Sequence, residues 1–183
     1  MVAAEKPAPA LIGEAEKAYR SGRYADAAAL YEQAASACLK VGDMLQAAEQ
    51  ENNRSVALLL SGDARGASAA AERAGEAFHK AGDGIRYGLA LGNQAAALEA
   101  LAKRKEALAA FQKSADVLKQ NGDRKYRGHV LKKIATLQLR SGRVIEALAS
   151  MHAAYLYQQK LGPVEWVLKK LLDLVFRMFG RSR

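Results

Sequence analysis

Cysteine, proline and tryptophan are scarce in this sequence of 183 residues, which has one Cys, three Pro and one Trp. A lone Cys38 excludes a disulfide framework and any metal site built from several cysteines. No proline falls between positions 9 and 163, so no such helix breaker interrupts most of the chain. No apolar run approaches the roughly 20 residues that a membrane span needs. The first eleven residues also lack the apolar core of a secretory signal, and we therefore expect a cytoplasmic protein.

Hydrophobic residues make up 50% of the chain, with alanine the most frequent, and this composition excludes wholesale disorder. Alanine has the highest helix propensity, which favours packed helices over sheets. The length corresponds to roughly one domain with enough chain to bury a core. We therefore predict an all-α fold.

Acidic side chains are scarce in the second half of the sequence. Residues 1–100 hold 10 basic and 13 acidic side chains, a net of −3, whereas residues 101–183 hold 18 basic and 6 acidic, a net of +12. The two halves sum to the formal net charge of +9. This asymmetry indicates an electropositive surface on the C-terminal half.

Two series of turn signals repeat at a step of 40 residues. The first consists of Ser21-Gly22, Ser61-Gly62 and Ser141-Gly142, with Leu101-Ala102 in the missing place. The second consists of Gly42-Asp43, Gly82-Asp83, Gly122-Asp123 and Gly162-Pro163. Glycine is preferred just past a helix because it takes a positive φ without a Cβ clash, and aspartate caps the helix that follows. Each unit is therefore predicted to be a helix, a glycine turn, a second helix and a Gly-Asp turn.

The segments between these turns carry small residues in the same register. Three columns hold Ala or Ser in every unit: Ala15, Ser55, Ala95 and Ala135; Ala27, Ala67, Ala107 and Ala147; Ala34, Ala74, Ser114 and Ala154. A fourth column is usually large, with Tyr31, Ala71, Phe111 and Met151. Small residues let two helices approach closely, and the large residue fills the gap between neighbours.

The run Gly22-Arg23-Tyr24, followed by Ala27, Tyr31 and Ala34, resembles the second half of a tetratricopeptide repeat (TPR). The usual TPR period is about 34 residues, and the period of 40 resembles a longer-helix variant of the family. The resemblance implies a solenoid of helical hairpins, a right-handed superhelix with a concave groove for a partner. It implies four repeats at about 11–43, 44–83, 84–123 and 124–162, and residues 1–10 before them are predicted to be a disordered tail.

The segment 163–179 is predicted to be an amphipathic helix that caps the fourth repeat, ahead of a basic tail at 180–183. A solenoid needs a terminal cap with one polar face. The apolar surface of this helix exceeds one packing face and includes Trp166, Leu172, Phe176 and Phe179. Three hypotheses stay open for it: a cap alone, self-association or docking in a neighbour's groove, and insertion into an anionic membrane interface.

In the TPR family the groove is lined by the first helix of each pair. By register the lining here includes Glu49, Asn52, Asn53, Val56, Leu89, Asn93, Ala96, His129, Lys132, Lys133, Thr136 and Arg140. The candidate peptide-binding residues among them are Asn53, Asn93, His129, Lys132, Lys133 and Arg140. The family's carboxylate clamp, which holds the end of a chaperone peptide, matches at two of its five positions, Asn93 and Lys133. The alternative is that Asn53 and Asn93 bond the helix backbone or each other.

Basic residues between positions 103 and 143 allow three interpretations: an acidic protein segment, nucleic acid, or solubility alone. No RNA- or DNA-binding motif accompanies them, so an acidic peptide is the preferred partner of the two. The three histidines show no His-Glu-x-x-His spacing, and no glycine-rich phosphate loop is present. We therefore expect no catalysis, cofactor or metal. The predicted function is a protein-interaction scaffold or adaptor; the alternative is a membrane tether or self-association module acting through the last helix.

Overall fold

The computed structural model describes residues 6–156 and 162–179, and the side chains of residues 175, 176, 178 and 179 lie outside this description. Within those ranges the secondary structure is helical, without strands. The helices are α1 (Ala8–Arg20), α2 (Tyr24–Lys40), α3 (Met44–Leu60), α4 (Ala64–Lys80), α5 (Gly84–Ala100), α6 (Arg104–Gln120), α7 (Arg124–Arg140), α8 (Val144–Leu156) and α9 (Pro163–Phe179). Helix α1 therefore begins inside the segment expected as a tail, and α3, α5 and α7 begin 40 residues apart.

The turns follow the chemistry that the sequence indicates. The Gly at the middle of each Gly-containing turn from position 22 to position 142 has a positive φ, between 73° and 96°. Ala102 adopts the same left-handed conformation, with φ 59°, so the third unit keeps its turn without the glycine. The side chains of four aspartates cap the following helices, each accepting a backbone N–H bond of 2.9 Å: Asp43, Asp63, Asp83 and Asp123.

The alanine columns form the contacts between helices. Every member of the three predicted small-residue columns is at most 2% exposed. Where serine replaces alanine, the hydroxyl has a backbone acceptor: Ser114 Oγ donates to Gly88 O at 2.6 Å, and Ser55 Oγ donates to Asn52 O at 2.6 Å. Cys38 is buried among the apolar residues of α2, and burial raises the pKa of its thiol.

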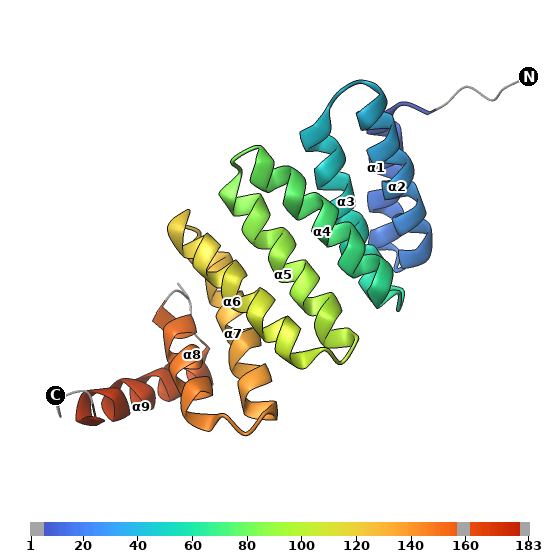
Figure 1. The fold of residues 1–183 in the computed structure, drawn as a ribbon. Helices are drawn as coiled ribbons and strands as arrows, with labels where there is room; N and C mark the ends of the chain where they lie inside the picture. Colours follow the sequence, from blue (N-terminus) through green and yellow to red (C-terminus); the bar gives the residue numbers. More distant parts are fainter. Residues whose placement is uncertain (1–5, 157–161, 180–183) are drawn as a thin grey trace, which may run out of the picture.

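The buried residues group into successive clusters along the chain instead of a central core. One cluster joins α1, α2 and α3, a second joins α3, α4 and α5 around Phe78, and a third joins α5 to α8 around Phe111. Each helix packs on the next, so the helices run in series from α1 at one end to α9 at the other (Figure 1). This serial packing of helical hairpins is a TPR-like solenoid, as predicted.

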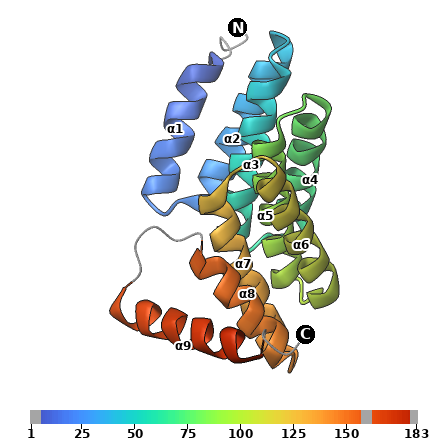
Figure 2. The same cartoon turned by 90° about the vertical axis from the view of Figure 1, so that its left-hand side faces the viewer.

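Helix α9 caps this array by lying across the end that carries α8 (Figure 2). Its contact with α8 is the smallest between consecutive helices of the described ranges. None of the helices in these ranges has the length and apolar character required to cross a membrane.

Candidate functional site

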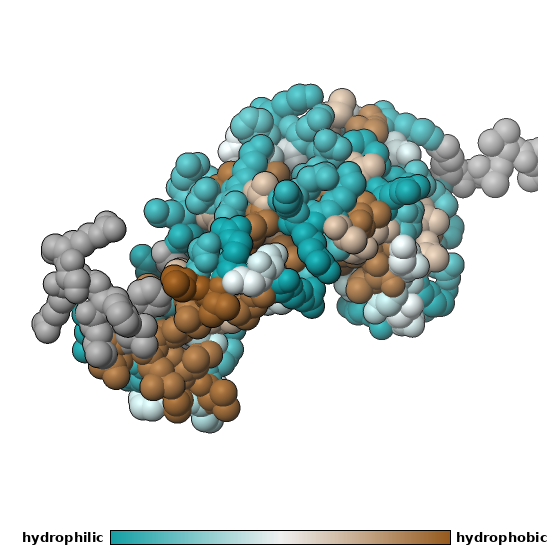
Figure 3. All heavy atoms as spheres, turned by 60° about the horizontal axis from the view of Figure 1, so that its bottom comes forward, coloured by the Kyte–Doolittle hydropathy of each residue, from teal (hydrophilic) through white to brown (hydrophobic). Residues whose placement is uncertain are grey.

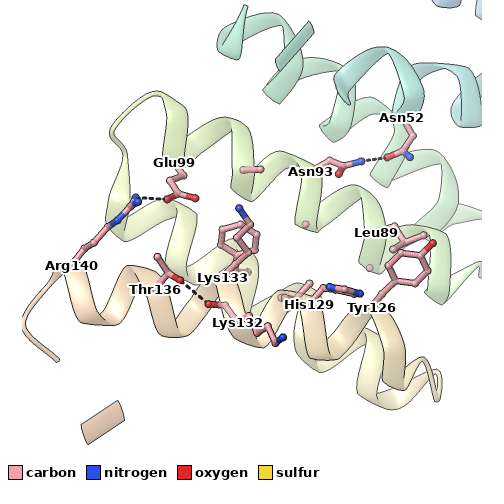
Figure 4. A pocket seen from close by; sticks show the side chains of 15 residues that line it. Asn52, Leu89, Asn93, Glu99, Tyr126, His129, Lys132, Lys133, Thr136 and Arg140 are labelled. Atoms are coloured by element: carbon pink, nitrogen blue, oxygen red, sulfur yellow. Dashed lines mark hydrogen bonds and ion pairs between the residues drawn. The ribbon is translucent and has the colours of Figure 1, made fainter. Parts of the chain in front are cut away.

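A hollow of about 670 Å³ opens between α3, α5, α6 and α7 on the side lined by the first helices of the pairs (Figure 4). Helix α5 contributes three small residues at a spacing of four: Gly88, Gly92 and Ala96. Gly92 lets α6 approach α5 closely, since a Cβ added there would lie 3.4 Å from Ser114 Oγ. A Cβ added at Gly88 would lie 2.7 Å from Leu118 Cγ, so α6 packs closely against the other side of this residue.

The structure brings five of the six predicted groove residues to this hollow: Asn93, His129, Lys132, Lys133 and Arg140. The sixth, Asn53, is half-buried on α3 and does not line it. Its neighbour Asn52 does. The two lie one residue apart on a helix, which turns them about 100° away from each other.

The two groove asparagines are bonded to each other across helices. Asn93 Nδ2 donates to Asn52 Oδ1 at 2.9 Å, which links α5 to α3 (Figure 4). The sequence left open that Asn53 and Asn93 bond each other. Asn93 does bond an asparagine of the preceding repeat, but its partner is Asn52 and not Asn53. Asn93 Oδ1 and the amide of Asn52 keep capacity for further hydrogen bonds, because each asparagine side chain has two donor hydrogens and an acceptor oxygen.

Two of the groove cations have acidic partners from distant parts of the chain. Arg140 Nη1 lies 2.9 Å from Glu99 Oε1 on α5, and Lys132 Nζ lies 2.8 Å from Glu165 Oε1 on α9. Lys132 Nζ also lies 5.5 Å from the centre of the Tyr155 ring. The groove is therefore less basic than the sequence of α7 suggests, since carboxylates neutralise these two groups.

Lys133 differs from Lys132 and Arg140 in its lack of a carboxylate partner among the described residues. Figure 4 shows its side chain directed from α7 toward α5, into the hollow. No ion pair joins it to another residue within 6–156 and 162–179. Lys133 is thus the groove cation that keeps its charge open to a partner, while the His129 ring lies 6.5 Å from the ring of Tyr126 at the end of the hollow.

Glu99 and Tyr126 also line the hollow, although neither was among the residues expected there from the sequence. Glu99 lies 41 residues before Arg140, with which it pairs, one position off the 40-residue register used to select the lining. Across the described part of the chain, no group of three or more His, Cys, Asp and Glu side chains is placed to hold a metal ion.

The predicted C-terminal surface divides into two faces. Trp166 is exposed, whereas Leu172 is buried at 4% exposure. The other two residues predicted for this surface, Phe176 and Phe179, have side chains outside the described set.

Comparison with known proteins gives no match to a family model and none to a curated protein. Among solved structures, the chain is similar to a variant of a Podospora anserina protein described by its nearly identical TPR-like repeats. The sequences are 17% identical, the TM-score is 0.49, and the match covers 95% of this chain and 96% of the other.

Proposed function

We propose that this protein is a non-catalytic cytoplasmic adaptor that holds a segment of a partner protein in the groove between α3 and α7. The observation that carries the proposal is the hollow of about 670 Å³ on the side of the array that the first helices of the pairs line. Its lining combines apolar surface with a few polar groups, which is the usual character of a binding site.

The polar groups suit an extended or helical peptide. The bonded pair Asn52 and Asn93 is fixed in position, and its remaining donors and acceptor face a site where peptide groups need partners. A side chain held by such a bond loses little conformational entropy when it binds.

An acidic residue of the partner is the expected ligand of Lys133. Lys132 and Arg140 already neutralise carboxylates of this chain, so the attraction for an anion centres on the third cation. The electropositive C-terminal half adds a longer-range attraction for the same class of partner.

The test is selection of a displayed random-peptide library on the full chain, followed by affinity measurement with labelled peptides from that selection. We expect enrichment of Asp and Glu in the selected peptides. Lys133→Glu replaces attraction with repulsion and is expected to weaken binding about tenfold, which corresponds to about 1.4 kcal/mol.

The matched control is Lys105→Glu, which changes the net charge equally at an exposed position outside the groove. It is expected to leave the affinity within about twofold of the original protein. Selected peptides that lack acidic residues, or an equal loss of affinity in both variants, would contradict the acidic-peptide proposal.

A further inference from the structure

The described side chains of α9 contact the solenoid through one face of the helix. Leu172 is buried, Leu168 is half-buried, and Glu165 and Asp173 reach back to the preceding helices. Glu165 pairs with Lys132 on α7, and Asp173 Oδ1 lies 2.7 Å from His152 Nε2 on α8. Hydrogen bonds from His152 and Lys169 hold the pKa of Asp173 below its ordinary value of 3.8, so this carboxylate is charged at neutral pH.

The opposite face of α9 is apolar and exposed. Val164, Val167, Leu171 and Leu174 are 80%, 50%, 55% and 51% exposed. Their steps of three and four place them on one side of an α-helix, and we call these four residues the outer stripe. Figure 3 shows hydrophobic side chains gathered at the end of the molecule that carries α8 and α9. An exposed apolar surface of this kind marks a site of interaction.

The charges beside the outer stripe have one sign. Lys170 and Arg177 are exposed on its flank, and Lys170 Nζ lies 5.6 Å from the ring centre of the exposed Trp166. Neither cation forms an ion pair within the part of the chain that the structure describes. The two acidic residues of α9 are committed to the inner face. The helix therefore presents outward an apolar stripe, a tryptophan and cations, without a carboxylate.

We propose that the outer face of α9 binds an anionic membrane surface. An amphipathic helix with apolar residues on one side and Lys, Arg and Trp at its border lies in the boundary between headgroups and acyl chains. Here the outer stripe enters that boundary, and Lys170 and Arg177 meet the anionic headgroups. The complementarity of charge favours lipid over a second copy, because two copies packed through the stripe would bring the same cations together.

Vesicle flotation of the full chain tests this inference. The probes are vesicles of phosphatidylcholine alone and vesicles that also contain phosphatidylserine. We expect flotation with the anionic vesicles and little with the neutral ones. The double variant Val167→Asn and Leu171→Asn is expected to lower the partition coefficient more than tenfold, because two apolar side chains no longer enter the boundary.

A second double variant removes charge and leaves the stripe intact. Lys170→Gln with Arg177→Gln is expected to lower partition about 25-fold, from about fivefold for each cation near an anionic surface. The matched control is Val41→Asn with Met44→Asn, which changes two exposed apolar residues at the turn between α2 and α3. Its partition should equal that of the original protein, and circular dichroism should show unchanged helicity in all variants.

Absence of flotation with anionic vesicles, or flotation that the stripe variant leaves unchanged, overturns the proposal. Sedimentation velocity provides the competing outcome: a dimer that the stripe variant dissociates, without vesicle binding, would assign this face to a second copy. Lys133 lies in the groove and not on α9, so the Lys133→Glu variant is expected to float as the original protein does.

Discussion

At the scale of single residues, the repeated turns contain both stabilising side chains and a strained backbone conformation. An aspartate at the start of a helix satisfies a backbone N–H that has no partner within the helix. Asp83 does more, because its second oxygen also accepts from Arg86 Nε at 2.6 Å. Ala102 shows the opposite case, since a residue with a Cβ is sterically strained at a left-handed φ of 59°.

Ala102→Gly is expected to raise the free energy of unfolding by about 0.5–1 kcal/mol. Glycine removes the steric strain of the left-handed conformation, and the greater entropy of the unfolded chain offsets part of that gain. Chemical denaturation measures the difference. Gly62→Ala, at the equivalent turn of the preceding repeat with φ 96°, is the reverse control and should destabilise. Lower stability of Ala102→Gly would contradict the strain argument.

Asp83→Asn is expected to lower stability at pH 7 by about 0.5–1 kcal/mol, while keeping an oxygen that caps the helix. The backbone N–H of Arg86, and then its side chain, lower the pKa of Asp83 from its ordinary 3.8. A carboxyl whose pKa is lower in the folded state stabilises that state above pH 3.8, and the contribution disappears as the pH falls through the folded-state pKa.

Denaturation of both proteins across this pH range measures the effect, and their difference should shrink toward zero in acid. Asp63→Asn is the control. Among the hydrogen bonds of the described residues, the Asp63 side chain accepts one from the backbone N–H of Gly66 and none from another side chain. It should show a smaller difference at pH 7. A difference for Asp83→Asn that stays constant into acid would contradict the assignment to its charge.

At the scale of elements, α9 is the helix whose attachment is weakest and whose two faces have different roles. Its small contact with α8 means that it can detach while the repeats stay folded. Leu171 and Leu172 are adjacent in sequence, but one lies on the outer stripe and the other is buried against the solenoid. Substitutions of Leu172 and Leu171 therefore test two properties independently: how the helix is held on the solenoid, and what its exposed apolar face does.

Leu172→Ala is expected to increase hydrogen exchange throughout α9 by about thirtyfold, because loss of a buried leucine side chain costs at least about 2 kcal/mol. The repeats from α1 to α6 should keep their protection. Leu171→Ala, with a side chain that is already 55% exposed, is expected to change exchange less than twofold. Equal exchange in the two variants would show that α9 is not held through Leu172.

At the scale of the molecule, stability is distributed along the array. Three successive clusters of buried residues replace a single core, so a repeat interacts mainly with its immediate neighbours. Folding of such arrays approximates a sum of repeat and interface contributions. A lesion in one cluster should therefore weaken the adjacent helices more than the distant ones.

Phe78→Ala and Phe111→Ala test this distribution. Each phenylalanine is at most 3% exposed, and each variant is expected to cost about 3–5 kcal/mol locally. Hydrogen exchange should rise most in α3 to α5 for Phe78→Ala and most in α5 to α8 for Phe111→Ala. Uniform loss of protection in both variants would mean that the chain unfolds as one unit.

The polar character of the groove depends on a hydrogen bond and on ion pairs between helices, which the residue pattern alone does not reveal. The 40-residue column selected Asn53, but the hydrogen bond forms between Asn52 and Asn93, which are separated by 41 positions. The twist between successive repeats decides which asparagine faces its counterpart, and a fixed step in sequence cannot represent that twist. Likewise, α7 alone suggests several free cations, although two of them have carboxylate partners on α5 and α9.

By itself, the sequence determined the helices, the turns and the buried columns of this protein. Helical hydrogen bonds, caps and glycine turns join residues within a few positions, so their signals are local. The shared small-residue columns then fixed which faces pack. Tertiary structure decided which charges remain open, at Lys133 in the groove and at Lys170 and Arg177 beside the outer stripe. Charge pairing depends on distances between helices remote in sequence, and only their packing sets those distances.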